Sequence, residues 1–187
     1  VHEAVAVNPV TGIVYQTEDR KPAGFYRYIP REKGHLARGG MLQMMTVEGS
    51  SSLNLEAETG RWYDVNWVTI EDPDRAHSPG TKDEGGVFNQ GYAQGGAAFQ
   101  KLEGCWWGND RCYFVASHGG RQGKGQGWAY TPRNETLELL FEFGAFAYAG
   151  AISIMASLAI WHNVMWEAQT LLAVFAVAYA TSIAARN

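Results

Sequence analysis

Two glutamates at matching places in the sequence are the first candidates for chemistry. Glu3 opens one strand-like run and Glu103 opens another, about a hundred residues later. A glutamate at the end of a strand is usually only solvated, but its repetition at equivalent points favours a shared role. Hard cations such as Ca²⁺ need about six to eight oxygen ligands, which no single short motif supplies. We therefore predict that Glu3 and Glu103 are metal ligands.

Three further charged residues flank these glutamates. Glu18 and Asp19 close the next strand-like run and are also candidate metal ligands. Because consecutive side chains of an extended chain point to opposite sides, at most one of them faces a given site, and a merely polar turn is the alternative. Lys101 precedes Glu103 by two residues, on the same face of an extended chain. Its ammonium group would either hold a substrate phosphate or form a surface ion pair.

The segments that carry these residues resemble short β-strands joined by tight turns. Glycine is abundant, with 22 residues, and aromatic residues reach 13%, without helical periodicity. Four strand-like runs fall within residues 1–48 and four more within residues 97–142, with Tyr15 and Tyr113 at matching places in the second runs. Each set has roughly the 40–50 residues of one propeller blade. We predict a mainly β fold with two four-stranded antiparallel propeller-like blades, which together make an incomplete β-propeller.

The remaining sequence divides into a connection and a tail. Residues 49–96 form an excursion between the blades, in which 62–70 alternates like an extra strand and 71–96 is rich in Asp, Pro and Gly. The apolar tail, 143–187, has no charged residue from Phe143 to Trp161 and favours helix. Its length permits a membrane-embedded helical hairpin through 143–185, and the alternative is a buried apolar segment.

Net charge and the two cysteines bear on nucleic-acid binding, disulfide formation and zinc binding. With 15 basic and 19 acidic residues the formal net charge is -4, which gives no reason to expect a nucleic-acid partner. Cys105 and Cys112 flank the turn at 108–110, so they either form a disulfide across a hairpin or remain free thiols. Their spacing does not match a zinc site.

Several motifs in one order carry a resemblance to a known family. In residues 1–142 the sequence resembles the PhoX-type alkaline phosphatases in the following runs: His2-Glu3-Ala4-Val5-Ala6-Val7, Thr11-Gly12-Ile13-Val14-Tyr15, Thr17-Glu18-Asp19, Ala23-Gly24-Phe25-Tyr26-Arg27, Leu102-Glu103-Gly104, Tyr113-Phe114-Val115, Gly119-Gly120 and Gly125-Gln126-Gly127-Trp128. Each run is short, but their combination and order are specific.

The resemblance implies a fold, an activity and a site. It implies a propeller of about six blades, in the periplasm or secreted, that hydrolyses phosphoric monoesters at a cluster of Ca²⁺ and Fe³⁺ held by carboxylates. Glu3 and Glu103 match family glutamates that would bind metal, and Lys101 falls where the family often has Arg, as a phosphate contact. The apolar tail departs from the family pattern.

Two blades cannot close a ring, so this chain is expected to be a fragment or to need a partner chain that completes the propeller. Whether it is active by itself stays open. Two other functions remain as alternatives. One is a non-catalytic β module for binding or assembly, tethered to a membrane by the tail. The other is a calcium-dependent lactonase, which would also use axial carboxylates.

Overall fold

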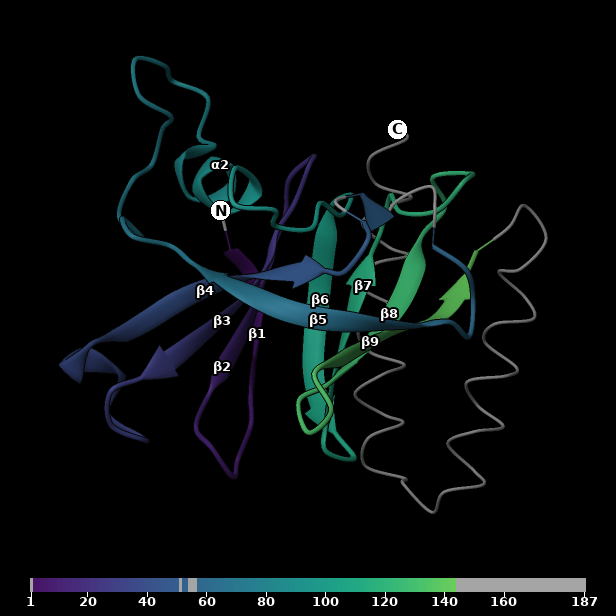
Figure 1. Ribbon diagram of the computed structural model, residues 1–187, viewed down its shortest axis with the longest axis horizontal. Helices are drawn as coiled ribbons and strands as arrows, with labels where there is room; N and C mark the ends of the chain where they lie inside the picture. The colour runs from purple at the N-terminus through teal and green to yellow at the C-terminus, as the bar shows by residue number, and fades with distance from the viewer. Residues whose placement is uncertain (1, 51, 54–56, 144–187) are drawn as a thin grey trace, which may run out of the picture. The chain divides into compact units, whose positions relative to one another are not determined.

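The computed structural model describes residues 2–50, 52–53 and 57–143, and these residues form a nine-stranded, nearly closed antiparallel sheet (Figure 1). The order of the strands in the sheet is β1-β2-β3-β4-β5-β9-β8-β7-β6. The strands are β1 (His2–Val7), β2 (Val14–Glu18), β3 (Phe25–Pro30), β4 (Gly40–Val47), β5 (Trp62–Thr69), β6 (Leu102–Gly108), β7 (Arg111–Ala116), β8 (Gln126–Thr131) and β9 (Thr136–Glu142). A short 3-10 turn, η1 (Leu36–Arg38), and one helix, α2 (Gly86–Tyr92), complete the described elements.

The prediction of a mainly β fold is confirmed, but the described strands form one nine-stranded sheet in place of the two four-stranded blades that were predicted. Strand β5 pairs with β4 through residues 65–69 and with β9 through residues 62–64. It crosses both units as one long strand (Figure 1). The described residues therefore form one continuous sheet, where the sequence predicted two independent blades. The local alternation that identified β5 as a strand carried no information about its partners.

The internal repeat is visible in the register of the two first hairpins. In both β1 and β6, the pairing with the next strand is irregular between the first and fourth residues. Glu3 and Glu103 lie in these two irregular segments. Tyr15 and Tyr113 each pair with the third residue after the glutamate, so they occupy equivalent positions, as predicted. Bulges of this kind redirect side chains and are frequent beside functional sites.

Equivalent residues of the two units differ in whether they face the shared core. Tyr15 is fully buried in this core, whereas its equivalent Tyr113 is only half-buried, on the other face of its own unit. The core joins the units through aromatic rings, and the rings of Phe25 and Phe114 stack with centroids 4.2 Å apart. Trp128 packs against the same ring of Phe114, at 6.4 Å. The face of the first unit that carries Tyr15 therefore packs against the face of the second unit that is opposite to Tyr113.

A carboxylate at the β8–β9 turn also ties the two units together. Glu135 accepts hydrogen bonds from the Nε1 of Trp67, at 2.9 Å, and from the hydroxyl of Tyr130. It forms an ion pair with Arg27 at 3.1 Å, and the Arg27 guanidinium stacks on the ring of Trp67. Burial and the bond to Glu135 raise the pKa of Tyr130 well above its usual value, so this hydroxyl remains a donor.

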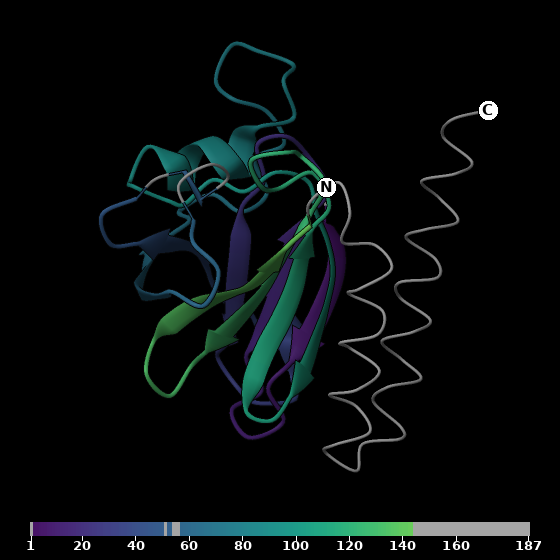
Figure 2. The same ribbon diagram turned by 90° about the vertical axis from the view of Figure 1, so that its right-hand side faces the viewer.

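The excursion between the units carries the helix α2, which the sequence analysis did not predict. Two of its seven residues are glycines, and no side chain caps its start. Tertiary packing stabilises it instead, because Phe88 is buried in a second core with Tyr26, Met44 and Ile70. Figure 2 shows the part of the excursion after β5, residues 70–96, gathered at one end of the strands.

Two other predictions concern the tail and the thiols. No helix among the described residues is both long enough and apolar enough to cross a membrane. The predicted helical tail, 143–187, lies outside the described residues except for Phe143.

Cys105 and Cys112 are free thiols, and Cys112 is fully buried. Of the two alternatives for this pair, the structure therefore has the unbridged form.

Replacing Phe114 with alanine should destabilise the protein by about 3–5 kcal/mol, because it removes a buried ring from the core between the units. Urea unfolding followed by tryptophan fluorescence measures this change. Val10→Ala is the control, since Val10 is 73% exposed. A loss below about 1 kcal/mol for Phe114→Ala, typical of surface substitutions, would show that the two units do not depend on this contact.

Candidate metal centre

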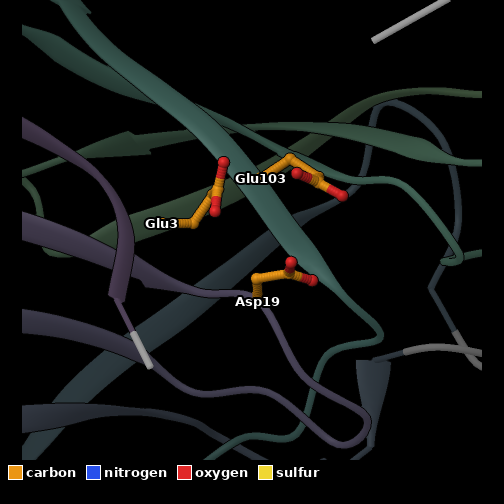
Figure 3. Close-up of side chains that lie close together, drawn as sticks. All are labelled: Glu3, Asp19 and Glu103. Atoms are coloured by element: carbon orange, nitrogen blue, oxygen red, sulfur yellow. The ribbon is translucent and has the colours of Figure 1, made fainter. Parts of the chain in front are cut away.

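Three carboxylates from two different units converge at one end of the sheet. Glu3 comes from β1, Asp19 follows directly after β2, and Glu103 comes from β6, and Figure 3 shows the three side chains drawn together. One carboxylate oxygen of each lies within 4.8 Å of the others. Glu103 and Asp19 are partly buried and Glu3 is exposed. The structure thus brings together three of the four acids predicted from the sequence as metal ligands.

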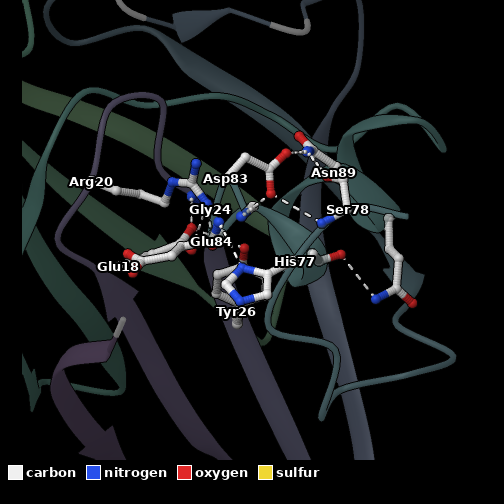
Figure 4. A network of polar contacts seen from close by, with 12 residues as sticks. Glu18, Arg20, Gly24, Tyr26, His77, Ser78, Asp83, Glu84 and Asn89 are labelled. Carbon is white, nitrogen blue, oxygen red and sulfur yellow. Dashed lines mark hydrogen bonds and ion pairs between the residues drawn. The ribbon is translucent and has the colours of Figure 1, made fainter. Parts of the chain in front are cut away.

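Glu18 is the acid that does not join this group, since it points to the other side of the chain. Its carboxylate is almost fully buried and accepts hydrogen bonds from the backbone N–H of Gly24, at 2.9 Å, and from the hydroxyl of Tyr26, at 3.0 Å (Figure 4). Burial raises the pKa of Glu18, although these two donors act in the opposite direction. The alternation of an extended chain thus separates Glu18 from Asp19, as expected.

The same polar network anchors the excursion beside the carboxylates. Arg20 donates from Nη1 to the carbonyl of Glu84 at 2.8 Å, and Figure 4 shows this contact close to Glu18. Asp83 accepts hydrogen bonds from the backbone N–H groups of Ser78 and Gly85, which hold the pKa of Asp83 well below its usual range. The loop is therefore organised by its own side chains and fastened to the end of β2.

Lys101 lies among the carboxylates and is held there by its backbone. It precedes β6 and adopts a left-handed conformation with φ of 54°. Its N–H donates to the carbonyl of Arg20 at 2.9 Å, and its carbonyl accepts from the N–H of Ser117 at 2.8 Å. The ammonium group lies 2.7 Å from a Glu103 oxygen and 3.4 Å from an Asp19 oxygen. The hydrogen bond to Glu103 raises the pKa of Lys101.

Ser117 and His118 belong to this site, and the sequence analysis missed both. The Ser117 hydroxyl lies 3.1 Å from a Glu103 oxygen and 3.2 Å from Nδ1 of His118. Burial lowers the pKa of His118, and the charges of Lys21 and Lys101 lower it further, so the imidazole is neutral near pH 7. Aligning the two repeated units could have identified Ser117, because the strand register makes it the equivalent of Asp19.

The donor set fits a hard cation. Three carboxylates within 4.8 Å of one another carry more negative charge than the single ammonium of Lys101 offsets. Carboxylate and hydroxyl oxygens are the ligands of Ca²⁺ and of other hard metal ions, whereas soft ions prefer thiolates. Three carboxylates supply at most about six oxygens, so such an ion would also bind water or further groups.

Comparison with known proteins identifies the family. A family model described as alkaline phosphatase PhoX matches residues 1–161. The chain belongs to this family. No curated protein and no solved structure gives a match. The match extends beyond residue 142, where the motifs noted in the sequence end. Members of the PhoX family are metal-dependent alkaline phosphatases, and this chain has an acidic group that could hold a metal ion.

Glu103→Gln should weaken Ca²⁺ binding at least about tenfold, because it removes one of three converging charges. Isothermal titration of the metal-stripped protein with Ca²⁺ measures the Kd. Glu48→Gln, an exposed glutamate outside the cluster, is the control and should leave the Kd unchanged. Equal affinities of Glu103→Gln and the unaltered protein would mean that the three acids are only a solvated group.

Proposed function

We propose that this chain contributes to a metal-dependent phosphomonoesterase and that Glu3, Asp19 and Glu103 hold its metal ions. The convergence of these three carboxylates from two repeated units carries the proposal. Two of them, Glu3 and Glu103, come from equivalent irregular segments of the repeat, about a hundred residues apart in the sequence. Membership of the PhoX family gives the cluster its chemistry and makes a phosphomonoester the expected substrate.

We further propose Ca²⁺ and Fe³⁺ as the ions, as the family resemblance implies. When bound, such ions neutralise the phosphate and lower the pKa of an oxygen nucleophile. The oxygen-only character of the three acids supports hard ions of this kind. The chain's own contribution is then to place these ligands in a fixed geometry before substrate arrives, which is the main requirement for electrostatic catalysis.

Lys101 would contact the substrate phosphate. In the structure its ammonium group is paired with Asp19 and Glu103, which neutralises part of the acidic cluster. A metal ion among the carboxylates would take over this neutralisation, and the Lys101 side chain, about a third exposed, would then be available for a phosphate oxygen. His118 is neutral and lies beside Ser117, so it would accept or donate a proton next to the site.

The packing of the two units supports an incomplete propeller. Tyr15 faces the shared core, whereas its equivalent Tyr113 faces away from it, as they would if rotation about an axis related the units. Repeating this rotation would place another unit against the outer face of β6–β9, where Trp106 and Tyr113 stack at 5.3 Å and are only half-buried. Further propeller strands, from more polypeptide or from a partner chain, would cover this face and add ligands.

The cellular location belongs to the same proposal. The family resemblance favours the periplasm or secretion, and the apolar segment 143–185 would provide membrane attachment.

Hydrolysis of p-nitrophenyl phosphate at alkaline pH, in the presence of Ca²⁺ and Fe³⁺, tests the activity. We expect Asp19→Asn to lower kcat/KM at least about a hundredfold through loss of a metal ligand, an effect of about 2.7 kcal/mol. Lys101→Met should raise KM for phosphate esters more than it lowers kcat. Glu48→Gln serves again as the control and should leave both constants unchanged.

Two results would contradict the proposal. Hydrolysis of lactones without any phosphatase activity would assign the carboxylates to a lactonase. Metal binding without hydrolysis of either substrate, after a partner chain or further propeller sequence has been supplied, would favour a non-catalytic module.

A further inference from the structure

The two glutamates lie on strands that do not pair with each other. Strands β1 and β6 are the opposite ends of the sheet in the described residues, so no ladder of backbone hydrogen bonds fixes their separation. They nevertheless lie side by side (Figure 1). Because Glu3 and Glu103 must keep their carboxylates within a few ångströms, some other interaction has to set this distance.

Thr17, in β2, makes the contacts that span the gap. Its side chain is fully buried, and its hydroxyl accepts a hydrogen bond from the N–H of Ala4 at 3.0 Å. The same hydroxyl donates to the carbonyl of Glu103 at 2.5 Å. One oxygen atom therefore joins the residue that follows Glu3 to the backbone of Glu103 itself.

These contacts fall where regular pairing is missing. The N–H of Ala4 and the carbonyl of Glu103 belong to the two irregular segments at the starts of β1 and β6. A buried backbone group without a partner costs about 1–3 kcal/mol, so the hydroxyl satisfies two groups that the bulges leave free. It also fixes them relative to each other.

The second unit has no hydroxyl at the position equivalent to Thr17. The strand register makes Val115 the equivalent of Thr17, and valine has nearly the same shape as threonine but no hydroxyl. A threonine is thus present only in the unit whose neighbour supplies Glu103. Val115 is only partly buried, whereas Thr17 is fully buried and its hydroxyl contacts link β1 to β6.

We propose that Thr17 is a positioning residue of the metal centre, which sets the separation of Glu3 and Glu103 through its hydroxyl. The inference rests on the proposed function, since it concerns the same site. The Thr17 hydroxyl bonds to backbone atoms of Ala4 and Glu103 and is not one of the clustered acids. It acts through the backbone of the two ligand segments, so its loss should change metal affinity while leaving the fold in place.

Three variants of the full chain test this role by titration with Ca²⁺ alone. Thr17→Val keeps the shape and removes the hydroxyl, and it should raise the Kd about 10- to 100-fold, as the loss of a ligand-orienting partner usually does. Thr17→Ser restores the hydroxyl and should bring the Kd to within about threefold of the unaltered protein. Thr136→Val is the matched control, because the buried Thr136 hydroxyl has no hydrogen-bond partner, and its Kd should not change.

Thermal unfolding without metal separates this role from a purely structural one. A lower Tm with an unchanged Kd for Thr17→Val would overturn the inference and leave the proposed function intact. If Thr17→Val does not fold, Thr17→Ala takes its place, and the same affinities decide. If the unaltered protein binds no Ca²⁺ and hydrolyses no phosphomonoester, both proposals are wrong.

Discussion

The contact between the first strands of the two repeated units is the constraint on which the candidate site depends. Strands β1 and β6 close the sheet from its two ends without pairing, so every interaction that holds the units together also holds the carboxylates together. The stacked rings of Phe25 and Phe114 hold the units together within the core. The ion pair between Arg27 and Glu135 is a second tie between the units. The site is thus only as rigid as the interface between the units.

Electrostatics makes this rigidity necessary. Three carboxylates within 4.8 Å of one another repel, and the repulsion is strongest where Asp19 and Glu103 are withdrawn from water. Lys101 offsets part of this repulsion, and its left-handed backbone conformation is a cost that the surrounding structure must compensate. A group of acids that is unfavourable for folding but favourable for a cation is the expected form of a functional site.

Sequence patterns predicted the strands and the acids because both are local or repeated features. Alternation identified eight strands of the two units, and the repeat identified Glu3 and Glu103. Long-range pairing was not predictable in the same way, because nothing in the sequence of β5 indicates that it joins β4 to β9. Helix α2 was missed because its stability comes from Phe88 in a tertiary core and not from propensity. Ser117 was missed because its role requires the register of β7.

Comparison of the two units by register also shows how a repeat becomes a site. Asp19 in one unit corresponds to Ser117 in the other, and both lie at the cluster. Thr17 corresponds to Val115, which is the exchange of a linking hydroxyl for a methyl group. The first unit therefore supplies two acids, while the second supplies one acid with a lysine and a serine beside it. Equal backbones carry unequal side chains, and a cation at their junction would meet an asymmetric environment.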